Sequence, residues 1–357
     1  MEPKNRLQRL RQQLAQKEIE AIWISQPENL YYLSGCEGLE GYLLIGEGNL
    51  LVTDFRYVEQ ARRQSPDFEI FTISGKMADW LPGLFSEHKI RRLGFENHHL
   101  SFAAYRQMED VFRKLQTPID LIPGDNLMDS LRMVKEPEEA ELIYQAVKIA
   151  DAAFEHLEKE LKPGVSEKAL AWDIEKFIRE NGSQPLPFEI IVAAGPNAAL
   201  PHAKPSDYVI QEREPIVVDI GARYKYYTSD LTRTFYIGKM PGTFRQVYQT
   251  VLDAQLTAIS YIKSGMTGAQ ADAIARQLIG NAGFGEAFGH SLGHGIGLAA
   301  HESPYLGFTS KGVLTDGMVF TIEPGIYLSG WGGVRLEDDV VMENGKLRVI
   351  SSARKLM

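Results

Sequence analysis

The sequence predicts an α+β protein, in which a small α/β domain is followed by a larger domain built from helix pairs and strands. Short apolar runs alternate with helical patterns between residues 21 and 122, as in a compact α/β domain with a mixed sheet. A long amphipathic pattern begins at Pro137, and two helix pairs then each lead into a β-rich segment. We therefore place the domains at residues 1–124 and 125–357, the second with a pseudo-duplicated order of elements.

The first domain begins with an amphipathic helix on which Leu7, Leu10 and Leu14 share one face. Six short apolar runs follow it, and we expect strands at residues 21–25, 42–46, 50–54, 68–73, 91–96 and 119–122. Helical patterns lie between some of these runs, at residues 57–64 and 103–116. This alternation predicts a single sheet with helices packed against it.

The second domain opens with a helix that starts at Pro137, a favoured residue in a first helical turn. Apolar residues follow at three- and four-residue spacing, which predicts one buried stripe made of Ala140, Ile143, Tyr144, Val147, Ala150, Phe154, Leu157 and Leu161. Ser166 is expected to cap the next helix, with a buried face of Leu170, Ile174, Phe177 and Ile178. A second helix pair is expected at about residues 244–263 and 268–279.

The composition excludes several classes of protein. The chain has 38 Lys and Arg against 47 Asp and Glu, a net charge of −9, and no basic block, which argues against nucleic-acid binding. Its single cysteine, Cys36, cannot form an internal disulfide and favours a reducing compartment. The N-terminus lacks the apolar core of a signal peptide, and no run of about 18 apolar residues occurs. We expect a cytoplasmic protein that does not enter a membrane.

Three histidines fall within twelve positions of the segment FGHSLGHGIGLAAHE, residues 288–302, which is otherwise small and apolar. Histidine is the commonest side chain for metal binding and for proton transfer near neutral pH. The glycines between them would allow close approach of the backbone. Any one of these histidines alone would be expected to be an ordinary hydrogen-bonded side chain, but three together indicate a site.

Two pairs of carboxylates lie in segments that otherwise predict buried strands. Asp230 follows Asp219 by 11 residues, and a turn centred on Tyr224-Lys225 would place them opposite each other. Glu337 follows Glu323 by 14 residues, across a glycine-rich turn. Like charges placed opposite each other are unfavourable unless a cation lies between them. A turn aspartate beside a hydrogen-bonded aspartate, and a glutamate paired with Arg335, are the structural alternatives.

Four carboxylates and one imidazole form an oxygen-rich ligand set with a single nitrogen. Such a set suits Mn²⁺, Co²⁺ or Fe²⁺, with Zn²⁺ as an alternative. Two divalent cations would balance the four negative charges, and paired metals about 3.5–4 Å apart are a recurring hydrolytic centre. The sequence therefore predicts a dinuclear site, with Mn²⁺ or Co²⁺ preferred.

The segments DIGARYKYYTSDLTRT, HSLGHGIGLAAHE, IEPGIY and VRLEDD resemble signatures of the pita-bread metallopeptidases, which include aminopeptidase P, prolidase and methionine aminopeptidase. The likeness covers the chain from Asp125 onward. The preceding α/β domain is similar to the creatinase-type amino-terminal domain of the aminopeptidase P and prolidase branch. This resemblance implies hydrolysis of Xaa-Pro bonds, at the N-terminus of peptides or in dipeptides, by a homodimer or homotetramer.

The resemblance also implies a role for each side chain. The metal ligands would be Asp219, Asp230, His294, Glu323 and Glu337, of which Asp230 and Glu337 would bridge two cations. Glu323 would take a proton from the attacking water. His202, which lies 17 residues before Asp219, and His301 would stabilise the oxyanion and help to protonate the leaving nitrogen. The pocket for the proline ring would involve His290, Tyr327 and Arg335.

Other functions are known on this fold, and two classes remain as alternatives, another enzyme of the fold and a non-catalytic binding protein. Methionine aminopeptidases usually lack the amino-terminal domain predicted here. Creatinase-like enzymes and non-catalytic peptide-binding relatives lose metal carboxylates that this sequence retains. The complete ligand set favours a Xaa-Pro peptidase, while the choice between aminopeptidase P and prolidase stays open, as do the native metal and the oligomeric state.

Overall fold

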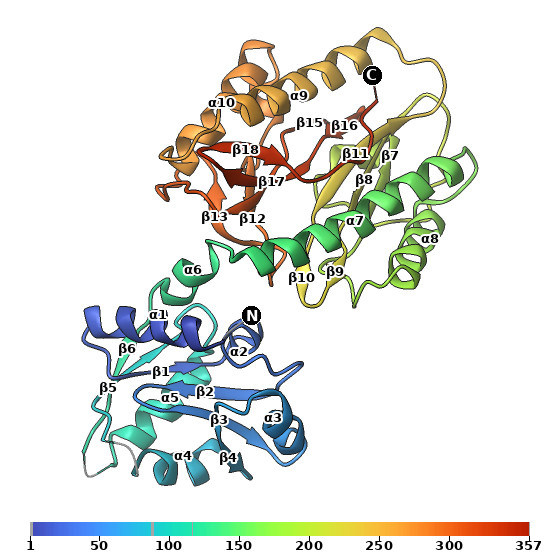
Figure 1. Cartoon of the computed structure of the whole chain (residues 1–357). Coiled ribbons are helices and arrows are strands. Elements are labelled where there is room, and N and C mark those ends of the chain that lie inside the picture. The colour runs from blue at the N-terminus through green and yellow to red at the C-terminus, as the bar shows by residue number, and fades with distance from the viewer. Residues whose placement is uncertain (1–2, 87–88, 116, 357) are drawn as a thin grey trace. The chain divides into compact units, whose positions relative to one another are not determined.

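The computed structural model describes residues 3–86, 89–115 and 117–356, with 39% of the chain helical and 24% in strands (Figure 1). The chain divides into two compact units, Met1–Leu131 and Arg132–Met357. The division falls in the short helix α6 (Leu127–Arg132), whereas the sequence analysis places the domain boundary after residue 124. The Tyr32 hydroxyl donates a 3.0 Å hydrogen bond to the Leu131 carbonyl, which attaches most of this helix to the first unit.

The first unit is built on a six-stranded mixed sheet in the order β4-β3-β2-β1-β5-β6. Its strands are β1 (Ala21–Ile24), β2 (Gly41–Ile45), β3 (Asn49–Asp54), β4 (Glu69–Ile73), β5 (Arg92–Phe95) and β6 (Asp120–Pro123). Antiparallel pairing joins β1 to β2 and β2 to β3, and the other neighbours are parallel. All six predicted strands and the mixed sheet are therefore confirmed.

Helices pack on both faces of this sheet (Figure 1). They are α1 (Pro3–Gln16), α2 (Pro27–Ser34), α3 (Val58–Gln64), α4 (Met77–Ser86) and α5 (Phe102–Phe112). The predicted apolar face of α1 is buried, and α4 and α5 enclose a core around Trp23 and Phe85. The sequence analysis missed α2 and α4, because α2 spans only eight residues and α4 contains Pro82, so neither shows a sustained helical stripe.

The second unit repeats one pattern twice, a helix pair followed by strands (Figure 1). The first half has α7 (Pro137–Glu160), α8 (Glu167–Glu180), β7 (Ile191–Ala194), the 3₁₀ turn η1 (Gly195–Ala199), β8 (Pro215–Ile220), β9 (Arg223–Tyr224), β10 (Tyr227–Thr228) and β11 (Leu231–Tyr236). The second half begins with α9 (Gly242–Tyr261), α10 (Gly268–Asn281) and the 3₁₀ turn η2 (Gly285–Ala287). Its strands are β12 (Gly293–Gly295), β13 (Glu302–Leu306), β14 (Val319–Ile322), β15 (Gly325–Leu328), β16 (Gly332–Arg335), β17 (Asp338–Glu343) and β18 (Lys346–Val349).

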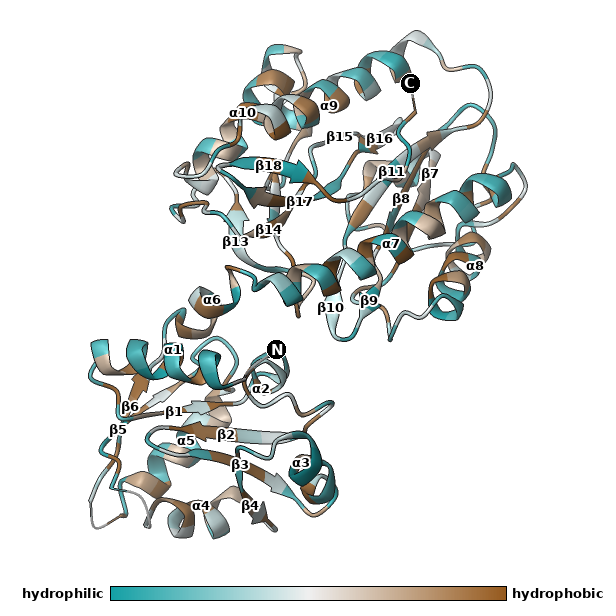
Figure 2. Ribbon diagram, viewed as in Figure 1, coloured by the Kyte–Doolittle hydropathy of each residue, from teal (hydrophilic) through white to brown (hydrophobic). Residues whose placement is uncertain are grey.

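Each helix pair lies against its own antiparallel sheet, β11-β8-β7 in the first half and β13-β12-β14-β17-β18 in the second. Apolar residues gather on β7 and β8 and on one side of the surrounding helices (Figure 2). Phe244 of α9 and Phe320 of β14 are fully buried in the core of the second half. The expected order of two helix pairs and two β-rich halves is confirmed.

The helix signals in this unit are largely confirmed. A capping box formed by Glu136 and Glu139 starts α7, and the Ser166 side chain accepts a hydrogen bond at the start of α8. The predicted stripe on α7 is wrong at Tyr144, which is 37% exposed and lies beneath the Lys148 ammonium group. A 3.6-residue period places Ala146 and Val147 at the centre of the buried face, so Tyr144 falls at its edge.

Candidate metal centre

Asp219 and Asp230 come from the antiparallel strands β8 and β11 and the ribbon that joins them. The register pairs Asp219 with Thr232, so Asp230 is its diagonal neighbour on the same face of the sheet. The predicted turn at Tyr224-Lys225 is wrong by one residue. Lys225 and Tyr226 form it instead, with φ values of 46° and 74°, because a two-residue turn of this hand matches the twist of the strands.

Glu323 and Glu337 lie opposite each other between two strand pairs. The β14–β17 register pairs Ile322 with Asp338, and the β15–β16 register pairs Gly325 with Arg335. When either register is extended toward the other, it places Glu323 opposite Glu337. The two glutamates therefore face each other, as the sequence predicts. The backbone N–H of Glu337 donates to the Thr232 carbonyl, which connects this ladder to β11.

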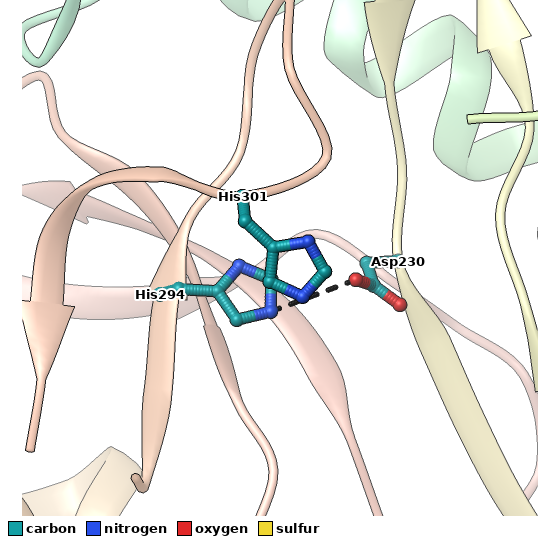
Figure 3. A group of neighbouring side chains, drawn as sticks. All are labelled: Asp230, His294 and His301. Atoms are coloured by element: carbon teal, nitrogen blue, oxygen red, sulfur yellow. Dashed lines mark ion pairs between the residues drawn. The ribbon is translucent and has the colours of Figure 1, made fainter. Parts of the chain in front are cut away.

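His294 enters the same space from β12. An added Cβ at Gly293 would lie 2.0 Å from the Thr321 carbonyl oxygen, so only glycine lets β12 approach β14 this closely. The His294 Nδ1 lies 3.2 Å from the Gly295 carbonyl, and Nε2 lies 3.2 Å from Glu323. Nε2 also lies 3.7 Å from Asp230 (Figure 3). A backbone acceptor for Nδ1–H fixes the tautomer that leaves Nε2 free to bind a metal.

The structure brings the five predicted ligands together. Three overlapping groups have candidate ligand atoms within 4.8 Å of one another, namely Asp230–His294–His301, His294–Glu323–Glu337 and Asp219–Asp230–Glu337. The rings of His294 and His301 lie 4.0 Å apart, and both point toward Asp230 (Figure 3). Four carboxylates and two imidazoles from both halves of the second unit therefore surround one space.

The electrostatics of this cluster suit a cation. Burial, followed by the neighbouring carboxylates, raises the pKa values of Asp230 and Glu337 well above their ordinary range. Burial opposes ionisation of Glu323 as well, but the hydrogen bond from His294 and the charges of His294, His290 and Arg335 together outweigh it and lower the pKa of Glu323 to about 2. Asp219 Oδ1 is buried with no hydrogen-bond partner among the described residues. The crowded acidic groups and the orphaned oxygen both fit divalent metal binding.

Arg335 and two threonines orient these carboxylates. Arg335 pairs with Asp219 at 2.6 Å, whereas the structural alternative predicted a glutamate as its partner. Its Nε donates to the Thr232 hydroxyl, which leaves the hydroxyl proton for Glu337 Oε2 at 2.6 Å. Likewise the Thr321 hydroxyl accepts a hydrogen bond from the backbone N–H of His294 and donates one to Glu323 Oε1 at 3.2 Å.

The sequence analysis missed both threonines. The signal that could have found them is the strand period of two, since Thr232 follows Asp230 by two residues and Thr321 precedes Glu323 by two. Residues at that spacing share a face of the strand, and a hydroxyl is short enough to stay beside a carboxylate. Oriented carboxylates of this kind are usual around bound metals.

The cluster lies in a cleft of about 410 Å³. His202, His290 and His301 line this cleft together with the five ligand candidates and Arg335. Tyr327 lies behind them, and its hydroxyl accepts from Arg335 at 2.8 Å and donates to His290 Nε2 at 3.0 Å. Burial lowers the pKa of His290, and burial followed by the adjacent His294 lowers the pKa of His301 to about 4. Both rings are therefore neutral at pH 7.

A cleft that contains clustered carboxylates, an oriented imidazole and further neutral histidines is typical of metal-dependent hydrolases. Residues 141–344 match the metallopeptidase family M24, and residues 6–134 match the creatinase/prolidase N-terminal domain. The chain belongs to metallopeptidase family M24, and the expected fold class is confirmed.

Several proteins that this chain resembles are named Xaa-Pro dipeptidase or X-Pro aminopeptidase. A Xaa-Pro dipeptidase of Pyrococcus furiosus is 36% identical over 99% of this chain and 100% of its own length. Among solved structures, a Xaa-Pro dipeptidase from Bacillus anthracis has a TM-score of 0.95 at 39% identity, covering 100% of this chain and 99% of that one. An X-Pro aminopeptidase from Thermotoga maritima has a TM-score of 0.89 at 36% identity, covering 98% of each chain.

None of the helices in the described ranges combines the length and the apolar content that crossing a membrane requires.

Proposed function

We propose that this protein is a peptidase that uses two divalent cations to hydrolyse the bond between a first residue and proline, in dipeptides or at the N-terminus of longer peptides. One observation carries the proposal, the gathering of five ligand side chains and three further histidines in one cleft. Relatives named for Xaa-Pro hydrolysis match this chain over nearly its full length, which supports the same substrate class.

The metal ligands in this proposal are Asp219, Asp230, His294, Glu323 and Glu337. Asp230 and Glu337 would be the ligands that both cations share. Each belongs to two ligand groups and offers two carboxylate oxygens, whereas His294, which also belongs to two groups, has only Nε2 free. The oxygen-rich set favours Mn²⁺ or Co²⁺ over Zn²⁺ or Fe²⁺. Divalent cations bound there would polarise the scissile carbonyl and lower the pKa of the attacking water.

The chain's own side chains then divide the proton transfers. Glu323, whose carboxylate is ionised at neutral pH, accepts the proton of the water. His202 and His301 line the cleft and can donate to the oxyanion. The leaving nitrogen of a Xaa-Pro bond is tertiary and carries no hydrogen, so it needs a proton before it departs. The proton that Glu323 took from the water is the one delivered, and the same histidines help to deliver it. His290 and Arg335, both supported by Tyr327, contact the proline ring.

The remaining assignments also belong to this proposal. Residues 125–357 form the catalytic domain, and the enzyme is a cytoplasmic homodimer or homotetramer. The single, buried Cys36 and the absence of any possible internal disulfide support a reducing compartment. Light scattering of the purified protein measures the oligomeric state.

We predict that Mn²⁺- or Co²⁺-loaded enzyme cleaves Ala-Pro or Met-Pro at least about ten-fold faster than matched Xaa-Ala substrates, measured as kcat/KM. Selectivity requires a pocket shaped for the ring and a proton source aimed at a tertiary nitrogen. An apolar pocket discriminates a small missing group by only about 1–3 kcal/mol, so Xaa-Ala is cleaved slowly rather than excluded.

Parallel assays with Ala-Pro and Ala-Pro-Ala decide between dipeptidase and aminopeptidase activity, with metal-stripped enzyme as the control. A preference for Met-Ala over Met-Pro would instead indicate a methionine aminopeptidase. Binding of peptides without hydrolysis in the loaded enzyme would indicate a non-catalytic member of the fold.

A further inference from the structure

His301 lies on the loop of residues 296–301, which joins β12 to β13. Thr228 holds one side of this loop, because its backbone N–H donates to the Gly297 carbonyl at 2.8 Å and its hydroxyl approaches the same oxygen at 3.1 Å. The Gly297 N–H in turn donates to the Ala299 carbonyl at 3.1 Å. His301 is an exposed residue whose ring contacts the His294 ring at 4.0 Å, so the loop backbone must hold the imidazole at that contact.

A buried carboxylate holds the other side of the loop. Glu302 follows His301 directly, is only 8% exposed, and accepts a hydrogen bond from the Ala299 N–H at 3.3 Å. Its carboxylate lies directly against Gly297, since an added Cβ there would come within 2.4 Å of Oε1. Glu302 is not among the residues that line the cleft, and its carboxylate lies against the loop backbone at Gly297.

Two buried, positively charged side chains hold this carboxylate in place. Lys135 Nζ donates to Glu302 Oε1 at 2.9 Å, and Arg132 pairs with Oε2. The Lys135 backbone is itself attached to the central sheet, because its N–H donates to the Gly317 carbonyl at 2.8 Å, immediately before β14. Through Lys135, Glu302 is therefore connected to the start of β14, the strand that leads into Glu323.

We infer that Glu302 is a positioning residue that acts through His301: clamped by Arg132 and Lys135, it holds the loop so that the His301 imidazole projects into the cleft beside Asp230 and His294. This inference rests on the proposed role of His301 in the reaction. Burying three charges is costly unless they are mutually paired, so a role for the triad in fold stability alone is the competing explanation. The two explanations differ in whether the effect of Glu302 depends on His301.

A double-mutant cycle on kcat distinguishes them, using the metal-loaded enzyme and Ala-Pro. We expect Glu302→Gln to lower kcat by about ten- to a hundred-fold when His301 is present, since a small misplacement of a catalytic group can have this effect. In a His301→Ala background, the same change should alter kcat by less than about two-fold. Metal content, measured by elemental analysis, should be unchanged in all four proteins.

Equal losses in both backgrounds would show that Glu302 acts independently of His301 and would overturn the positioning role, while leaving the role of His301 intact. If His301→Ala alone left kcat unchanged, the proposed function of His301 would be wrong, and the positioning role would fall with it. The two failures are therefore distinguishable.

Gly297→Ala provides a second route that leaves all three charges in place, in case Glu302→Gln does not fold. Its methyl group displaces the Glu302 carboxylate, and the backbone there is not in the left-handed region, so alanine is otherwise tolerated. The same loss of kcat, again only when His301 is present, is expected. Gly312→Ala is the matched control because an added Cβ there meets nothing within 4 Å, and its kcat should be unchanged.

Discussion

Asp230→Ala is expected to lower kcat at least about a thousand-fold and to release bound metal, while the protein remains folded. Asp230 belongs to two of the three ligand groups, so its loss removes a ligand from both halves of the cluster. The fold should survive, because burial and neighbouring carboxylates already disfavour the ionised form of this side chain in the metal-free protein. Elemental analysis, circular dichroism and turnover of Ala-Pro measure the three effects.

Asp253→Ala is the matched control. Asp253 lies on the exposed surface of α9, where its only described side-chain contact is with Gln249. Its variant should keep both metal and activity. Near-normal turnover of the Asp230 variant, with two metals still bound, would show that Asp230 is not a bridging ligand.

His202→Ala and His301→Ala should each lower kcat by about 10²- to 10⁴-fold without removing metal, because that range is typical of a lost proton donor. Both histidines line the cleft, but the five other ligand candidates complete the metal set without them. His156→Ala is a suitable control, since His156 pairs with Asp173 and stacks on Phe177 outside this site.

The geometry makes the His301 result especially informative. His301 is itself a member of a potential ligand group with Asp230 and His294 (Figure 3). If metal is lost from the His301 variant in proportion to activity, this histidine binds metal, and the proposed division of labour between His294 and His301 is incorrect.

The sequence predicted the parts of the fold that local patterns determine. All six strands of the first unit, the capping of α8 by Ser166 and the two helix pairs follow from periodicity and end signals, which depend only on neighbouring residues. The errors occur where tertiary structure decides. The turn at Lys225-Tyr226 requires two residues with positive φ that are neither glycine nor asparagine, which no turn preference indicates.

The site shows the same division. The acidic pairs stand out because carboxylates are unusual in apolar strands, and their spacing within each hairpin indicates that they meet. The bond between Arg335 and Asp219, the hydroxyl of Thr232 between Arg335 and Glu337, and the clamp on Glu302 join segments about 105 to 170 residues apart in sequence. Such contacts depend on how the two halves pack, which the local spacing of residues in a single sequence does not determine.

Titration of the metal-stripped protein with Mn²⁺, followed by proline release from Ala-Pro, tests the central claim most directly. The stripped protein should be inactive, and activity should rise with added Mn²⁺ to a plateau at two equivalents per chain, as the charge balance of four carboxylates predicts. Full proline release by the stripped protein, or no release at any Mn²⁺ concentration that fills the site, would contradict a metal-dependent Xaa-Pro peptidase.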